Sequence, residues 1–480
     1  MSGNPYAGFG LFIDGSWCKG TTAGDVFSPV SEQSLGQVAL ASKADTEDAI
    51  AAAGRGLAAW RSKSAFERAD ALHMIADAMR ARTDQATRMI TLETGKPLAQ
   101  SKREWGLSID QFRWYAEEAR RIYGRIIESR APGGRFEVLR EPVGITAAFT
   151  AWNFPAALLA RKIAPALAAG CSVVARPSSQ TPGTAMVMID CLRAGELPDG
   201  TVNLVVGATD DTYGPIMAAQ AVRKVSLTGS TRVGQQMIRD AADTVKKVSM
   251  ELGGNAPLIV FDDADLDAAL DVVVPTKYAN AGQVCVAPDR FYIHERVHDA
   301  FVEGFSARAS GLRLGDGLDP EVQMGPVINA KRLRDITGIV EGALSAGATL
   351  VTGGVRPPGF NAGHFFAPTV LTDVTDDMPV MAEENFGPIA PISRFTDDDE
   401  VYARANASDM GLAAYAFTTD MARARRTVAA LKSGMVGING VALAASEAPF
   451  GGVKYSGMGR EGGSEGIESF LDTKLAQIIV

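Results

Sequence analysis

The chain has 480 residues, enough for two large domains or about three of ordinary size. Its 46% hydrophobic content and net charge of −9 are typical of a globular protein and exclude a disordered or collagen-like chain. The acidic balance, without a basic tract, argues against nucleic acid or an anionic membrane as a partner, and four cysteines without paired spacing argue against a disulfide framework.

The N-terminal part of the chain is predicted to be mainly helical. Its first residues lack the basic start and apolar run of a secretory signal, which favours a cytoplasmic protein. A short strand is expected at 11–13, and apolar residues recur at helical spacing over 45–60 and 65–80. Between 124 and 142 the pattern becomes extended and β-like, with few packing partners nearby, which indicates an excursion from the main body.

From residue 143 onwards, strands and helices alternate. Such repeated strand–helix–strand units predict a parallel sheet with helices on both faces and ligands beyond the carboxyl ends of the strands. The predicted strands are 143–150, 171–175, 201–206, 222–227 and 245–250, and the predicted helices are 156–169, 181–194, 213–221 and 231–242.

A second α/β block begins near residue 254. Strands are expected at 257–261 and 291–294, a helix at 297–307, and a surface loop in the Gly/Pro-rich tract 353–363. The tail 475–480 is again β-like and apolar. Because an isolated strand at a chain end is not stable, the tail is predicted to pair with the excursion at 124–142 or with another subunit.

Three familiar motifs are present but lie in the wrong context. His294 and His298 spell H-E-x-x-H, yet a strand ending at His294 and a helix starting at 297 place a turn between them, so no metal site is predicted. The G-x-G-x-x-G at 457–462 has only 18 residues after it, too few for a dinucleotide fold. The 229–234 segment lacks the Lys of a phosphate loop but stands at the start of a predicted helix. There it is either a helix N-cap only or an anion-binding site.

Three residues remain as candidates for chemistry. Cys285 lies in a turn-prone segment and is either a reactive thiol or an inert buried one. Glu251 ends a strand and precedes two glycines, which places its carboxylate where ligands bind, as a base or as a structural group. Asn153 follows the first strand and offers an amide donor in an apolar setting, or caps the next helix.

Together these segments resemble the aldehyde dehydrogenase family along essentially the whole chain. The resemblance is carried, in the family's order, by Trp-Asn-Phe-Pro at 152–155, Gly-Ser-Thr-x-x-Gly at 229–234, Glu-Leu-Gly-Gly at 251–254, Gly-Gln-Val-Cys at 282–285, Glu-Asn-Phe-Gly-Pro at 384–388 and Pro-Phe-Gly-Gly at 449–452. It implies an α/β fold in three parts: a Rossmann-like parallel-sheet cofactor domain (1–122 and 143–253), an α/β catalytic domain (254–450) and a small β oligomerisation arm (123–142 and 466–480). It also implies a homodimer or homotetramer.

The resemblance further implies NAD(P)-dependent oxidation of an aldehyde to its acid, with Cys285 as the nucleophile. Asn153 and the Cys285 backbone N–H stabilise the thiohemiacetal oxyanion, Glu251 activates water against the thioester, and Lys162 helps to relay protons. The implied cofactor-binding residues are Trp152, Arg176, Ser178, Ser179, Gly229, Ser230, Gly234, Leu252, Gly253, Glu384 and Phe386, and the implied substrate-binding residues are Arg161, Phe154, Val284 and Val286.

Two departures from the family pattern bear on cofactor and substrate. Many relatives read Lys-Pro-Ser/Ala-Glu where this chain has Arg176-Pro-Ser-Ser179; loss of the Glu removes repulsion of a 2′-phosphate, so NADP is favoured over NAD. The sequence motifs most resemble those of the succinate-semialdehyde dehydrogenase branch, whose carboxylate-binding arginine matches Arg161. Its other two anchors are replaced by Ala279 and Ala444. Succinate semialdehyde is therefore one candidate, and a longer, aromatic or less charged aldehyde is the alternative.

Overall fold

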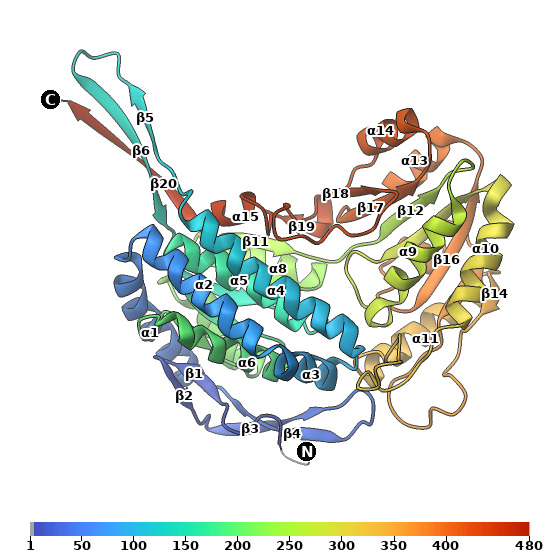
Figure 1. Ribbon diagram of the computed structural model, residues 1–480, viewed down its shortest axis with the longest axis horizontal. Coiled ribbons are helices and arrows are strands. Elements are labelled where there is room, and N and C mark those ends of the chain that lie inside the picture. Colours follow the sequence, from blue (N-terminus) through green and yellow to red (C-terminus); the bar gives the residue numbers. More distant parts are fainter. Residues whose placement is uncertain (1–3, 480) are drawn as a thin grey trace.

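The computed structural model describes residues 4–479; the first three residues and Val480, the last residue of the predicted tail, lie outside that part. Two sheet-containing bodies lie side by side, and a slender β arm projects from the first of them (Figure 1). No helix in residues 4–479 is long and apolar enough to cross a membrane.

The first body is built on an eight-stranded sheet of order β19-β11-β10-β7-β8-β9-β1-β2. The predicted alternation from residue 143 is confirmed: the five inner strands run parallel and are buried along most of their length, as expected for strands covered on both faces. The strands are β1 (Leu11–Ile13), β2 (Ser16–Cys18), β7 (Ile145–Phe149), β8 (Ser172–Arg176), β9 (Val202–Leu204), β10 (Val222–Thr228), β11 (Lys247–Glu251) and β19 (Gly457–Met458).

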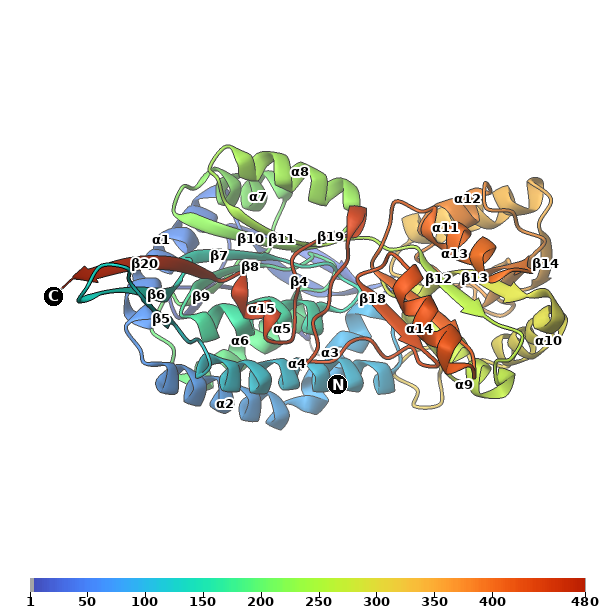
Figure 2. The same ribbon diagram turned by 90° about the horizontal axis from the view of Figure 1, so that it is seen from above.

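Helices cover both faces of this sheet (Figure 2). On one face lie α1 (Lys43–Arg61), α7 (Thr209–Ala218) and α8 (Thr231–Ala242); on the other lie α5 (Pro155–Ala169) and α6 (Pro182–Leu192), backed by α2 (Ala65–Ala81), α3 (Thr83–Thr94) and α4 (Leu98–Ala119). Helix α7 begins four residues before the predicted start, because Asp210 and Asp211 stabilise its first turn.

The N-terminal region differs from the prediction in having four strands before its first helix. β1 is confirmed, but β2 and the hairpin of β3 (Thr22–Phe27) and β4 (Ser34–Leu40) were not expected. Most of the β3 side chains are exposed, so the sequence carries no clear alternation of apolar and polar residues there.

The second body contains a seven-stranded sheet of order β14-β15-β16-β13-β12-β17-β18, in which only β14 runs antiparallel to its neighbour. The strands are β12 (Ala256–Val260), β13 (Pro288–His294), β14 (Thr349–Thr352), β15 (Thr369–Thr372), β16 (Ile389–Phe395), β17 (Ala413–Phe417) and β18 (Met435–Ile438). The helices are α9 (Leu266–Tyr278), α10 (Glu295–Ser310), α11 (Ala330–Ser345), α12 (Pro379–Ala382), α13 (Asp398–Asn406) and α14 (Met421–Ala430). His294 ends β13 and caps α10, and His298 lies within α10.

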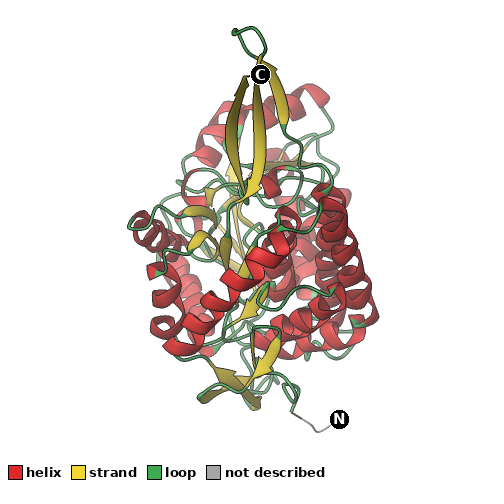
Figure 3. Ribbon diagram, turned by 90° about the vertical axis from the view of Figure 1, so that its left-hand side faces the viewer, coloured by secondary structure: helices red, strands yellow, loops and turns green. Residues whose placement is uncertain are grey.

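The arm consists of three antiparallel strands, β20-β6-β5, standing clear of the main body (Figure 3). They are β5 (Arg125–Glu128), β6 (Gly134–Pro142) and β20 (Leu471–Ile479), the last reached through the short helix α15 (Glu465–Glu468). Of the two partners considered for the tail, the structure pairs it with the excursion, from Leu471 opposite Pro142 to Ile479 opposite Gly134. Ile126 and Leu475 are exposed on the arm.

The candidate site residues follow strand ends in the first sheet and precede strand starts in the second. In the first sheet, Asn153, Ser230 and Leu252 follow the carboxyl ends of β7, β10 and β11. In the second sheet, Cys285 and Glu384 precede the amino ends of β13 and β16. The candidate residues from both bodies therefore meet between the carboxyl edge of one sheet and the amino edge of the other.

Candidate active site

Cys285 lies in a turn before β13, at the end of a backbone held in an unusual conformation. Asn280, Ala281 and Gly282 all have positive φ, of 48°, 54° and 74°. A Cβ at Gly282 would stand 2.1 Å from the Gly387 carbonyl oxygen, so only glycine fits there. Burial raises the pKa of the Cys285 thiol to about 12, and neighbouring carboxylates add to the rise. The resting group is therefore a neutral thiol near pH 7.

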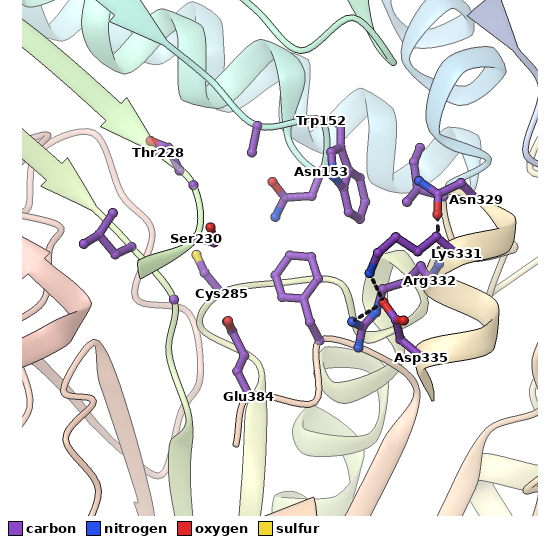
Figure 4. A pocket seen from close by; sticks show the side chains of 16 residues that line it. Trp152, Asn153, Thr228, Ser230, Cys285, Asn329, Lys331, Arg332, Asp335 and Glu384 are labelled. Carbon is purple, nitrogen blue, oxygen red and sulfur yellow. Dashed lines mark hydrogen bonds and ion pairs between the residues drawn. The ribbon is translucent and has the colours of Figure 1, made fainter. Parts of the chain in front are cut away.

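Asn153 faces the same cavity as Cys285, although 130 residues separate its amide from the loop it contacts (Figure 4). The residue is 4% exposed, and its Nδ2 donates to the Gln283 carbonyl oxygen at 3.1 Å. Gln283 in turn donates from Nε2 to the Asn280 carbonyl and accepts at Oε1 from the Ile328 N–H. The Asn153 amide is thus held against the loop of the second body that carries Cys285.

Glu251 ends β11 as a buried carboxylate. Gly451 leaves it room, since a Cβ there would lie 2.7 Å from Glu251 Oε1. Glu251 Oε2 has no hydrogen-bond partner among residues 4–479. Burial, and after it the charge of Glu461, raises the pKa of Glu251 well above its ordinary value, while Lys162 opposes that rise. A buried carboxylate with a raised pKa and a free oxygen is suited to take a proton from water.

Lys162, like Glu251, does not line the cavity, and it acts on the Glu251 carboxylate through its charge. Its side chain is 1% exposed; Nζ donates to Thr228 Oγ1 at 2.7 Å and forms an ion pair with Glu461. Glu461 Oε2 is buried and has no hydrogen-bond partner in the described part of the chain. Two buried titratable groups, Lys162 and Glu461, therefore interact with each other and act on Glu251 through their charges.

None of the four residues predicted to contact substrate lines the cavity. Arg161 is 7% exposed, and its guanidinium stacks 4.1 Å from the centre of the Phe450 ring. Its positive charge acts to lower the pKa of both Cys285 and Glu251. Phe154, Val284 and Val286 flank Asn153 and Cys285 along the chain.

The cavity measures about 400 Å³ and contains nine of the predicted site residues. Its lining consists of Ala151, Trp152, Asn153, Thr228, Gly229, Ser230, Leu252, Gly253, Cys285, Ile328, Asn329, Lys331, Arg332, Asp335, Glu384 and Phe386. Glu384 Oε1 accepts from the Gly254 N–H at 2.9 Å, and burial raises the pKa of this carboxyl to about 8. Ser230 caps helix α8, whose N-terminal N–H groups attract anions.

Four predicted cofactor residues do not line this cavity. Gly234 is buried within α8 against Leu252. Arg176 donates to Thr212 Oγ1 and the Gly207 carbonyl, and Ser178 Oγ accepts from the Gln180 N–H. Ser179 lines an adjacent cavity of about 360 Å³, whose wall shares Ile328 and Asn329 with the first.

Sequence reasoning missed the wall formed by the start of α11. Arg332 donates to the Asn385 carbonyl oxygen, lies 3.6 Å from Asp335 and has a buried Nε without a hydrogen-bond partner among residues 4–479. Lys331 pairs with Asp335 at 2.8 Å (Figure 4). The only local signal was the helix cap Asn329, which marks where α11 starts and not what its first turn faces.

Comparisons with known proteins show the family and the fold of the chain. Residues 17–476 match the aldehyde dehydrogenase family. The chain is 45% identical over 466 residues to 3-sulfolactaldehyde dehydrogenase of Pseudomonas putida, which covers 96% of this chain and 95% of that protein. It is 44% identical over 465 residues to the NADP(+) succinate-semialdehyde dehydrogenase GabD of Escherichia coli, covering 96% of each. The crystal structure of succinate-semialdehyde dehydrogenase from Burkholderia pseudomallei superposes with a TM-score of 0.97, at 42% identity over the whole of both chains.

Proposed function

The chain belongs to the aldehyde dehydrogenase family, and on that premise we propose that it oxidises an anionic aldehyde to its carboxylic acid, with Cys285 as the nucleophile and NADP or NAD as the oxidant. The family membership confirms the resemblance drawn from the sequence motifs. The observation that carries the proposal is the meeting of Cys285, Asn153 and Glu384 around one cavity. Glu251, which has an unpaired carboxylate oxygen, is close enough for its charge to act on Cys285.

The chemistry begins at sulfur. Cys285 Sγ gives its proton to a water molecule of the cavity and forms a bond to the aldehyde carbon as the C=O π bond breaks. The carbonyl oxygen takes that electron pair and becomes an oxyanion, which accepts hydrogen bonds from Asn153 Nδ2 and the Cys285 N–H. When bound, NAD(P) supplies the acceptor for the hydride that leaves this carbon. The acyl group is then held on Cys285 as a thioester.

Release of the acid requires a base. Glu251 takes a proton from water, the resulting hydroxide attacks the thioester carbon, and the carbon–sulfur bond breaks with the electron pair returning to Sγ. Because its pKa is raised, ionised Glu251 is a stronger base than an ordinary carboxylate. Lys162 and Glu461 form an ion pair and both act on Glu251 through their charges, and we assign to them the removal of that proton from the site.

The chemistry of the cavity walls fits a dinucleotide. Glu384 supplies carboxyl oxygens for ribose hydroxyls, and the start of α8 with Ser230 supplies N–H groups for a pyrophosphate. We favour NADP because Ser179 places no carboxylate where many relatives carry one, so a 2′-phosphate meets no repulsion there. Arg176, held by Thr212 and Gly207, keeps a guanidinium on the same strand end.

For the substrate we propose an aldehyde with an anionic group at its far end. Arg161 is a buried cation without an ion-pair partner among residues 4–479. The names of the relatives, 3-sulfolactaldehyde and succinate-semialdehyde dehydrogenase, describe enzymes for such compounds. Ala279 and Ala444 replace the other two carboxylate anchors of the succinate-semialdehyde dehydrogenase branch. Arg161 is then the one cationic anchor for the substrate, and the smaller alanine side chains leave additional room beside it. Succinate semialdehyde is therefore our first candidate, and a longer, aromatic or less charged aldehyde is the alternative.

We also propose that the arm serves self-assembly, as a homodimer or homotetramer. Its three strands project away from the main body with apolar side chains exposed, and each outer strand has a free edge (Figure 3).

Reduction of NADP and of NAD, followed by absorbance, tests the proposed reaction. Succinate semialdehyde, butanal and benzaldehyde form the panel, and Cys285→Ala is the control. We expect the highest kcat/KM with succinate semialdehyde and NADP, and no reduction by the variant. A panel of aldehydes that gives no more signal with the wild type than with Cys285→Ala would refute the proposal.

A further inference from the structure

We propose that Lys96, which lies 57 residues before Asn153 in the sequence, is a positioning residue that fixes the location of Asn153. The inference rests on the proposed oxyanion role of Asn153. Lys96 Nζ donates to the backbone carbonyl oxygen of Asn153 at 2.6 Å and to Glu104 Oε2 at 2.6 Å. Both side chains of the Lys96–Glu104 pair are 0% exposed. Lys96 thus binds the candidate oxyanion residue directly, from a site that solvent does not reach.

Glu104 fixes the other side of the same turn. Its Oε1 accepts from the backbone N–H of Ala156 at 2.8 Å and of Ala157 at 3.3 Å. These are N–H groups of the first turn of α5, and Phe154, the residue before the helix, provides no side-chain cap. Glu104 therefore supplies from α4 the cap that α5 lacks, while Lys96 holds the carbonyl that precedes the helix.

The aromatic residue of the turn completes the clamp. Lys96 Nζ lies 4.0 Å from the centre of the Phe154 ring, close enough for a cation–π contact. Asn153, Phe154 and the first turn of α5 are thus all held by one ion pair. A second donor, Asn280 Nδ2, reaches the same Asn153 carbonyl at 3.1 Å and also lies 3.3 Å from the Gln283 carbonyl.

The free-energy cost of burying the Lys96–Glu104 ion pair indicates a role beyond stability. Burying an ion pair is expensive, and apolar side chains of similar volume often serve stability as well or better. Here the pair fixes the backbone of a residue whose Nδ2 has to meet an oxyanion within a few tenths of an ångström. Because a misplacement of about 1 Å can cost about 100-fold in rate, a rigid clamp on Asn153 has a catalytic consequence that a simple core contact lacks.

A double-mutant cycle tests the proposal. The variants are Lys96→Met with Glu104→Gln, which removes both charges together so that neither is left unpaired, Asn153→Ala, and all three changes combined. Arg68→Met is the matched control: Arg68 donates to the Ala168 carbonyl at 3.0 Å, at the far end of the same helix α5. Steady-state kcat and KM are measured with succinate semialdehyde and NADP, and thermal unfolding by circular dichroism gives the Tm of each variant.

We expect Asn153→Ala to lower kcat about 100-fold or more, and the Lys96–Glu104 double variant to lower kcat about 10- to 100-fold with KM little changed. In the Asn153→Ala background the same double change is expected to cost less than about threefold. Arg68→Met should lower Tm without changing kcat.

An equal loss of kcat in both backgrounds, or a folded double variant with wild-type kcat, would overturn the positioning role while leaving Cys285 chemistry intact. If Asn153→Ala itself kept wild-type kcat, the oxyanion role of Asn153 in the proposed function would fail, and the positioning role would fail with it.

Discussion

Replacement of Arg161 by methionine separates recognition of the anion from the chemistry at the aldehyde carbon. Arg161 and Lys162 are consecutive on α5, so their side chains leave the helix in different directions, the first onto Phe450 and the second to Glu461. Methionine retains the apolar stem of Arg161 over the ring and removes only the cation.

The magnitude follows from the burial of the guanidinium. A charge-assisted hydrogen bond is worth about 1.5–3 kcal/mol, and each 1.4 kcal/mol is about tenfold, so kcat/KM for succinate semialdehyde should fall about 10- to 100-fold. Butanal has no carboxylate and should lose far less. Because the positive charge of Arg161 lowers the pKa of Glu251 and Cys285, its removal should move the acid limb of the butanal pH profile to higher pH.

The assay is kcat/KM for both aldehydes across pH, with Arg161→Lys as the control that keeps a cation without the planar fork. The lysine variant should lie between the wild type and Arg161→Met for succinate semialdehyde. Equal losses for the charged and uncharged aldehydes in Arg161→Met would refute the assignment of Arg161 to the anionic end of the substrate.

Three further predictions concern the cofactor, pH and the turn that carries the nucleophile. Ser179→Glu should lower kcat/KM for NADP about tenfold or more relative to NAD, because its carboxylate would repel a 2′-phosphate; equal effects on both cofactors would contradict this. Folding raises the pKa of Glu384 to about 8, so the folded chain holds a proton that the unfolded chain has lost, and wild-type stability falls as pH rises towards 8. The free energy of unfolding of Glu384→Gln should therefore rise relative to that of the wild type by about 4 kcal/mol between about pH 5 and about pH 9, and a pH-independent difference in urea unfolding would contradict this. Gly282→Ala should lower both Tm and kcat, since its Cβ would stand 2.1 Å from the Gly387 oxygen, whereas Gly342→Ala, with no atom within 4 Å and a place inside α11, should raise Tm slightly.

The inner strands of the first sheet were accessible to sequence reasoning because they are buried on both faces. Segments such as β7 are almost continuously apolar, and the turns between strand and helix carry glycine or polar caps, so the alternation is visible locally. The β3–β4 hairpin was not accessible, because most of the β3 side chains are exposed and the register of the hairpin depends on the partner strand.

The site residues also divide into those that the sequence could predict and those that it could not. Asn153 and Ser230 follow strand ends, and Cys285 stands in a recognisable motif, so their chemistry could be inferred along the chain. Lys96 and Glu104 could not be assigned, because Lys and Glu are almost always exposed and nothing local distinguishes a buried pair from a solvated one. Only the packing of α4 on α5 brings them to the turn.

The most direct test of the mechanism is the mass of the Cys285 peptide after a single turnover. With deacylation blocked by Glu251→Gln, mixing with succinate semialdehyde and NADP should leave a succinyl group on Cys285, together with a burst of reduced cofactor. A burst with no acyl group on that peptide, or an acyl group on another residue, would contradict the account.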